Sequence, residues 1–160
     1  MRLLEQQIVA QVGACLQQAQ TALNQSFAMP TIRFNQRGKI AGSARLLQWE
    51  LRFNPVLLKD NPEAFLQDVV PHEVAHLIVY QCFGRVRPHG KEWQAVMQQV
   101  FKRPAKTTHQ FDVSQVQGQL YAYRCSCQTH QLTVRRHNKM SRQQVSYRCR
   151  TCGQALVPNH

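Results

Sequence analysis

The sequence PHEVAHLI, residues 71–78, contains two histidines four residues apart and a glutamate directly after the first histidine. Its mostly apolar neighbours predict a buried helix. Residues four apart on a helix differ by about 40° of rotation, so His72 and His76 share one face and their imidazoles can reach one Zn²⁺ ion. Buried polar side chains are costly unless a partner satisfies them, which favours a metal site over two histidines that share a helix by chance.

The glutamate of this stretch has the position of a general base. Glu73 lies about 100° around the helix from His72, so its carboxylate can touch a water molecule at the metal without being a ligand. Zinc lowers the pKa of such a water towards about 7, and the carboxylate can take its proton as the water attacks a carbonyl. It can then pass the proton to the leaving amine. Glu73 is therefore the predicted catalytic acid/base.

A catalytic zinc ion usually has three protein ligands and one open position. The metzincin spacing would require glycine at position 79 and histidine at position 82, where this chain has Val79 and Cys82. His89 is the favoured third ligand, because it follows the expected helix end at Gly84 and precedes the next helix. Glu92 is the competing candidate. Tyr80 and Arg85 are candidate oxyanion donors on their proximity in sequence alone.

Hydrophobic periodicity predicts mixed secondary structure. A helix is expected over 2–25, ending before Met29-Pro30, and another from Pro62 to Gly84, with a break or bend just before His72 that Pro71 imposes. A further helix is expected from Gly90 to Phe101. Strands are expected in TIRFN (31–35), KIAGSAR (39–45) and QWELRFN (48–54), the last as an edge strand that could pair with a substrate peptide. Short β-like runs follow from residue 120: LYAYR, QLTVRR and QVSYR.

Four of the six cysteines form two close pairs, Cys125/Cys127 and Cys149/Cys152. The second pair has the spacing CxxCG, which is typical of a zinc knuckle, and two such pairs predict a zinc ribbon that clamps one structural Zn²⁺ ion. A short module with few large apolar residues needs such a metal to fold.

Other residues offer alternatives to this ligand set. His130 and His137 are close enough in sequence to replace a cysteine. The remaining cysteines, Cys15 and Cys82, stand alone on apolar helical faces and are interpreted as buried thiols. Clustered cysteines in a chain without a signal peptide indicate metal more than disulfides.

The charge of the chain is concentrated in its last part. The net charge is +12, and residues 101–160 contribute +9 with a single acidic residue, Asp112. A field of this sign favours polyanions, so nucleic acid is the predicted partner, with DNA favoured. The predicted contacts are the basic residues of the ribbon: Arg124, Arg135, Arg136, Lys139, Arg142, Arg148 and Arg150.

Three tyrosines lie between these basic residues. Tyr121, Tyr123 and Tyr147 could stack on unpaired bases. They could equally form the small core of the ribbon, which is the interpretation we favour.

Six stretches resemble the SprT family of zinc metalloproteins over nearly the whole chain. They are NQRGKIAG (35–42), LRFNP (51–55), VVPHEVAH (69–76), PHGKEW (88–93), YRCSC (123–127) and YRCRTCG (147–153). The family includes the eukaryotic protease Spartan, which cleaves proteins covalently trapped on DNA. The resemblance implies zinc ligands at His72, His76 and His89 and a catalytic role for Glu73.

The resemblance also implies a fold and an activity. We expect an α+β fold with a zincin-like metallopeptidase core over 1–112, with helices packed on a small sheet, and a zinc-ribbon module over 113–160. The expected function is a zinc-dependent endopeptidase, with one catalytic and one structural Zn²⁺, that nucleic acid recruits to DNA-bound or DNA-crosslinked proteins. The alternative is a non-enzymatic, zinc-containing nucleic-acid-binding protein on the same scaffold.

The location of the protein is a separate expectation. The first 20 residues contain Glu5 and several glutamines, so they do not read as a signal peptide. No stretch approaches the roughly 18 apolar residues of a membrane helix. We expect a cytoplasmic protein with a protein or peptide substrate and no membrane partner, and the sequence carries no prediction of oligomeric state.

Overall fold

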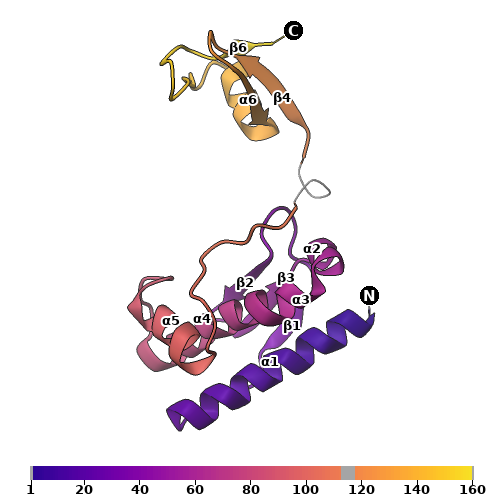
Figure 1. The fold of residues 1–160 in the computed structure, drawn as a ribbon, viewed down its shortest axis with the longest axis vertical. Coiled ribbons are helices and arrows are strands. Elements are labelled where there is room, and N and C mark those ends of the chain that lie inside the picture. Colours follow the sequence, from indigo (N-terminus) through magenta and orange to yellow (C-terminus); the bar gives the residue numbers. More distant parts are fainter. Residues whose placement is uncertain (1, 113–117, 160) are drawn as a thin grey trace. The chain divides into compact units, whose positions relative to one another are not determined.

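The computed structural model describes residues 2–112 and 118–159. The chain divides into two compact units, residues 1–116 and 117–160. The first unit contains helices and a small sheet, and the second contains a second small sheet and one helix (Figure 1). The chain therefore has the expected α+β composition. The domain boundary predicted between residues 112 and 113 adjoins positions outside the described ranges and stays a prediction.

The long first helix, α1 (Arg2–Leu23), forms one side of the core. Its buried residues recur at helical spacing: Ile8, Val12, Cys15, Leu16 and Ala19. This face packs on the later helices of the unit, as the amphipathic pattern requires. Cys15 is 2% exposed, in agreement with its interpretation as a buried thiol.

Three strands make the sheet of the first unit: β1 (Thr31–Arg33), β2 (Gly42–Arg45) and β3 (Glu50–Phe53). Their order is β1-β3-β2, with β1 parallel and β2 antiparallel to β3. The prediction that QWELRFN forms an edge strand is therefore wrong, because its strand β3 has a partner on both sides. The local alternation of side chains cannot reveal this order, since it is the same for central and edge strands.

A short helix that the sequence did not suggest, α2 (Pro55–Asp60), follows the sheet. Asn54 is its N-cap: the side-chain oxygen accepts from the amides of Val56 and Leu57, and Pro55 occupies the first turn. The same amide group donates to the carbonyls of Gly38 and Ile40, which fixes the loop before β2. Asn54-Pro55 thus ends a strand and begins a helix.

The helix that carries the histidines begins in three steps. A short turn, α3 (Pro62–Ala64), leads into a π-helical segment, η1 (Phe65–Val69), and then into α4 (Val70–Phe83). Pro71 lies in the first turn of α4, where its missing N–H is tolerated. The predicted disturbance thus takes the form of a π-turn that ends two residues before Pro71. Gly84 ends α4 with a φ of 75°, as expected for a C-terminal glycine.

The last helical stretch of the unit is α5 (Lys91–Ala95), which continues as a second π-helical segment, η2 (Val96–Val100). Its apolar face, with Trp93, Val96, Met97 and Val100, is buried in the core. Residues 102–112, which we call the strap, follow without a regular helix or strand.

The second unit has a sheet of order β5-β4-β6, formed by β4 (Leu120–Arg124), β5 (Thr129–Thr133) and β6 (Val157–Pro158). The expected strand QLTVRR is wrong in its second half, because Val134 begins a helix, α6 (Val134–Ser141). Thr133 caps that helix by accepting from the amide of Arg136. QVSYR forms only an isolated bridge between Arg148 and Ala155.

No helix in the described ranges combines the length and the apolar content that crossing a membrane requires.

Candidate metal centres

Helix α4 and the loop before α5 bring three imidazoles together. The Nε2 atom of His72 lies 3.3 Å from Nε2 of His76 and 3.2 Å from Nε2 of His89. The three ring centroids are each 5.0 Å apart, and the candidate ligand atoms all lie within 4.8 Å of one another. The turn of the chain after Gly84 thus places His89 beside the helical pair.

The tautomer of His72 follows from its second hydrogen bond. Its Nδ1 lies 3.2 Å from the carbonyl oxygen of Lys106, in the strap. A carbonyl can only accept, so Nδ1 carries the proton and Nε2 presents a lone pair to the cluster. A backbone carbonyl that orients an imidazole in this way is the usual outer partner of a metal-bound histidine.

The indole ring of Trp93 packs against all three imidazoles. It is fully buried, and its ring centroid lies 4.8 Å from those of His72 and His89 and 5.7 Å from that of His76. Its indole N–H donates to the carbonyl of His72 at 3.2 Å. The indole therefore fixes the helix and the rings at once.

The donor set fits a zinc ion. Two nitrogens bound tetrahedrally, each about 2.0–2.1 Å from zinc, lie about 3.3 Å apart, as these Nε2 atoms do. Burial lowers the pKa of His72 to about 4 and of His76 to about 3, so both rings are neutral, as a metal ligand must be. The competing candidate Glu92 is not part of the cluster.

Glu73 lies beside the cluster without belonging to it. Its side chain is 8% exposed, and Oε1 is 3.8 Å from Nε2 of His72. Burial raises the pKa of its carboxyl group to about 8. A nearby cation would favour the charged form and lower that pKa again.

Gly42 on β2 makes room for this carboxylate. A Cβ atom at position 42 would lie 3.2 Å from Cγ of Glu73 and 3.3 Å from the ring of Phe53. Strand β2 can approach α4 this closely only with glycine here.

The oxyanion candidates are not joined to the cluster. Tyr80 lies one turn beyond His76 on α4, and Arg85 is exposed in the loop after Gly84. In residues 2–112 no hydrogen bond or ion pair links either side chain to the three histidines. Their role stays a prediction.

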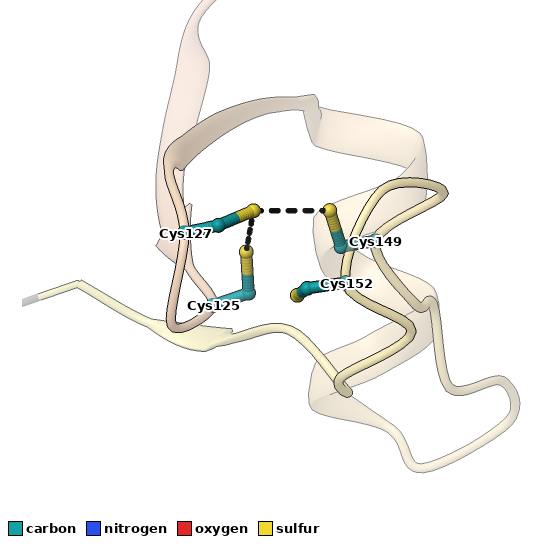
Figure 2. A group of neighbouring side chains, drawn as sticks. All are labelled: Cys125, Cys127, Cys149 and Cys152. Carbon is teal, nitrogen blue, oxygen red and sulfur yellow. Dashed lines mark hydrogen bonds between the residues drawn. The ribbon is translucent and has the colours of Figure 1, made fainter.

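The second unit gathers four sulfur atoms (Figure 2). Cys125 and Cys127 come from the turn after β4, and Cys149 and Cys152 from a later turn. The Sγ atom of Cys127 lies 3.5 Å from that of Cys125 and 3.7 Å from that of Cys149. Sulfurs at about 2.3 Å around a tetrahedral zinc ion lie about 3.8 Å apart, so this set also fits zinc.

Backbone amides stabilise negative charge on these sulfurs. The amides of Cys152 and Thr151 and the side-chain amide of Gln128 lower the pKa of Cys149 to about 5. Gly153, with a φ of 75°, makes the tight turn that this arrangement needs. These hydrogen bonds therefore favour the thiolate at Cys149, the form that binds a metal.

The two histidines proposed as alternative ligands have other partners. His130 Nε2 lies 3.3 Å from the sulfur of Cys125, as an outer partner of the four-sulfur cluster. His137 stacks on Tyr121 with a centroid distance of 3.7 Å and shares a 2.7 Å hydrogen bond with the hydroxyl of Tyr123. Neither histidine belongs to the cluster.

The predicted nucleic-acid contacts are mostly on the surface of the second unit. Arg124, Arg135, Arg136, Arg142, Arg148 and Arg150 are exposed, and Lys139 is half-buried. Arg136 lies over the ring of Tyr147 at 5.8 Å, and Arg148 donates to the carbonyl of Gly153. Tyr123 is part of the small core, and Tyr121 and Tyr147 pack against it, which agrees with the favoured interpretation of the tyrosines.

Comparison with known proteins assigns both units. Residues 12–114 match the model of the SprT-like family, and residues 119–159 match the SprT-like zinc ribbon domain. The chain belongs to the SprT-like family. Its first unit is thus a metalloprotease-like domain of that family with a cluster of three histidines, and its second is a zinc ribbon domain.

Individual relatives match over nearly their full length. The chain is 54% identical to Protein SprT of Actinobacillus succinogenes over 98% of this chain and 92% of that protein. It is 54% identical to Protein SprT of Vibrio parahaemolyticus, covering 89% and 86%, and 52% identical to that of Pasteurella multocida, covering 98% and 95%. No solved structure matches the chain.

Three supporting groups escaped the sequence analysis. Trp93 falls within the helix predicted from Gly90 to Phe101, and only its place four residues after His89 hints at a contact with the imidazoles. Gly42 falls within the predicted strand KIAGSAR (39–45), and nothing in that stretch indicates its contact with Glu73. The carbonyl of Lys106 has no signal in the sequence, because every residue carries one.

Proposed function

We propose that the protein is a zinc-dependent endopeptidase, with a catalytic zinc at His72, His76 and His89 and a structural zinc at the four cysteines. The observation that carries this proposal is the convergence of three Nε2 atoms beside a buried carboxylate that is not itself a ligand. A zinc ion bound there would supply a Lewis acid that activates water and polarises a carbonyl.

The residues around the histidine cluster have separate roles in this chemistry. Glu73 takes the proton of the attacking water on its carboxylate and passes it to the leaving nitrogen, so that it ends the cycle as it began. His72 is held by the carbonyl of Lys106, and Trp93 keeps the imidazoles from rotating. The apolar surroundings of Glu73 exclude bulk water from this proton.

The free edge of β2 is the proposed place for the substrate backbone. Within residues 2–112, β2 pairs only with β3, and its Gly42 touches Glu73. An extended peptide added to this edge would pass beside the carboxylate. The proposal thus moves the substrate-binding strand from β3 to β2.

The ribbon is the proposed recruiting module. The unit carries several exposed arginines, of which Arg135 and Arg136 lie in the first turn of α6. Phosphate groups of a nucleic acid are their natural partners. The proposed substrates are therefore proteins bound or crosslinked to DNA.

The test compares the zinc-loaded wild type with Glu73→Gln on a basic protein, with and without DNA. We expect cleavage that DNA increases, and a loss of at least about 100-fold in Glu73→Gln, because a positioned general base contributes about 10²–10⁴-fold. The variant keeps its shape and hydrogen-bonding surface, so zinc content and DNA affinity should be unchanged.

Two results would contradict the proposal. Equal cleavage by both proteins would remove Glu73 from the mechanism. DNA binding without cleavage by either protein, across free and crosslinked substrates, would instead favour the non-enzymatic nucleic-acid binder.

A further inference from the structure

A group of arginines lies on the solvent side of the core sheet, and none of them adjoins a metal-ligating residue in sequence. In β3, Leu51 and Phe53 face the core, so Glu50 and Arg52 face the other way. The register places Arg33 of β1 beside Arg52, and Arg45 of β2 opposite Glu50. Three arginines from three strands therefore share one face, which we call the arginine face (Arg33, Arg45 and Arg52).

Glu50 holds two of these arginines in place. Its carboxylate accepts from Nε of Arg33 at 2.6 Å and from Nε of Arg52 at 2.8 Å, and the Arg33 hydrogen bond keeps the pKa of Glu50 below its usual range. In the described part of the chain neither side chain makes another hydrogen bond. Each guanidinium group thus keeps its two terminal nitrogens for an outside partner.

Arg45 has no counterion at all among the described residues, although it lies opposite Glu50. It is exposed, as is Arg33. Three guanidinium groups against one carboxylate give the face a net charge of +2. Because Glu50 is already shared by Arg33 and Arg52, the positive charge of Arg45 is not balanced.

The chemistry of the face fits phosphates. Neighbouring strands are about 4.8 Å apart, so the arginines of β1, β3 and β2 span about 10 Å, over which one nucleic acid strand carries about three phosphates. Guanidinium groups bind phosphate in a bidentate manner. The other outward residues of the three strands are also polar, with Thr31 beside Glu50 and Ser43 beside Arg52, so the face offers no apolar pocket for peptide side chains.

We propose that the arginine face is a second phosphate-binding surface, which holds a nucleic acid strand on the core unit independently of the ribbon. This inference rests on the proposed nucleic-acid partner and adds a contact that the ribbon does not provide. Its consequence is that the proteolytic unit makes its own contact with the strand that carries the substrate.

The test is the salt dependence of binding of the zinc-loaded full chain to a fluorescent oligothymidylate. Arg45→Gln should weaken binding several-fold and lower the slope of log K against log salt by about 0.7, the value of one phosphate contact on a single strand. Glu50→Gln should strengthen binding, because it removes the only negative charge of the face. Lys59→Gln on α2, an exposed change of the same charge, is the matched control and should have little effect.

The outcomes separate this inference from the ribbon's role. The double variant Arg135→Gln/Arg136→Gln reports on recruitment by the ribbon, and Arg45→Gln should weaken binding further in its background. If Arg45→Gln behaves like Lys59→Gln while the ribbon variant loses affinity, the arginine face is not a binding surface and the ribbon proposal stands. If Glu50→Gln fails to fold, Arg45→Glu decides, with a larger loss than Arg45→Gln expected and no loss overturning the inference.

Discussion

The catalytic role proposed for Glu73 depends on the exact position of its carboxylate. It is held between the imidazole of His72 and the backbone of β2, where Gly42 has no side chain to displace it. Small displacements of a catalytic group are costly, because a misplacement of about 1 Å can cost about 100-fold in rate. The position of the carboxylate is therefore as important as its chemistry.

Gly42→Ala tests this dependence. The added methyl group would meet Glu73 at 3.2 Å, closer than most real contacts, and should lower kcat by about tenfold while zinc stays bound. Steady-state cleavage together with zinc content is the measurement. Gly13→Ala on α1, where an added Cβ meets nothing within 4 Å, is the matched control. An unchanged kcat in Gly42→Ala would show that Glu73 tolerates the crowding.

The raised pKa of Glu73 predicts a pH dependence of the metal-free protein. Between the unfolded pKa of 4.5 and the folded pKa of about 8, the folded state keeps a proton that the unfolded state has lost. The contribution of Glu73 to the free energy of unfolding should therefore fall as pH rises, by about 1–2 kcal/mol from pH 6.5 to 8. His72 and His76, whose pKa values are lowered in the folded state, lose protons over this range only when unfolded, and each should offset about 0.4 kcal/mol of this fall.

Denaturant unfolding followed by tryptophan fluorescence measures this slope, since Trp49 and Trp93 both belong to the first unit. Glu73→Gln should remove the fall that Glu73 causes, so that the variant's free energy of unfolding rises slightly between pH 6.5 and 8, as the lowered histidine pKa values require. Equal slopes in the wild type and the variant would mean that Glu73 is not the group that titrates.

The sequence predicted the charged and ligand-forming residues of the site, but not the residues that position them. His72, Glu73, His76 and His89 stand out because polar residues in an apolar helix or after a helix end demand a partner. Trp93 and Gly42 act through shape and contact. Such roles appear only when distant parts of the chain are brought together.

The strap is the element that links the histidines to the rest of the first unit. His109 donates from Nε2 to the carbonyl of Lys39 at 2.7 Å, and its ring stacks on Phe111, which stacks on Phe65. These contacts fix the segment whose Lys106 carbonyl holds His72. An irregular stretch thereby takes part in the metal centre.

His109→Ala should loosen this element and lower the zinc affinity of the histidine centre by about tenfold, the lower end of the effect of losing an outer partner. Competition with a chelator measures the affinity. Lys106→Ala is the matched control, because it keeps the carbonyl and should bind zinc as the wild type does. Equal affinities in both variants would show that the strap does not orient His72.

Elements with a strong period were predicted well, and elements set by pairing were not. The apolar positions of α1, α4 and α5 are local and recur at helical spacing. The order of β1, β3 and β2 depends on which strands pair with one another, and the sequence of a single strand does not determine its partners. Helix α6 was missed because VRR continues the polar–apolar alternation of the strand before it. The sequence alone does not show that Thr133 ends the strand and is the N-cap of this helix.

The whole molecule has two compact units, and each has its own ligand cluster. The first has a core large enough to fold around its histidines, whereas the second has only a few buried residues around its cysteines. Metal binding should therefore be linked to folding in the second unit and to activity in the first. The order of motifs along the chain indicated this division, because the cysteine pairs follow both histidine motifs.

Zinc content per chain, measured by elemental analysis, is the most direct test that His89 completes a metal centre with His72 and His76. The wild type and Glu73→Gln should each contain two zinc ions, whereas His89→Ala should contain one and keep the ribbon's zinc. A wild type with one zinc ion, or a His89→Ala variant that retains two with unchanged affinity, would contradict the assignment.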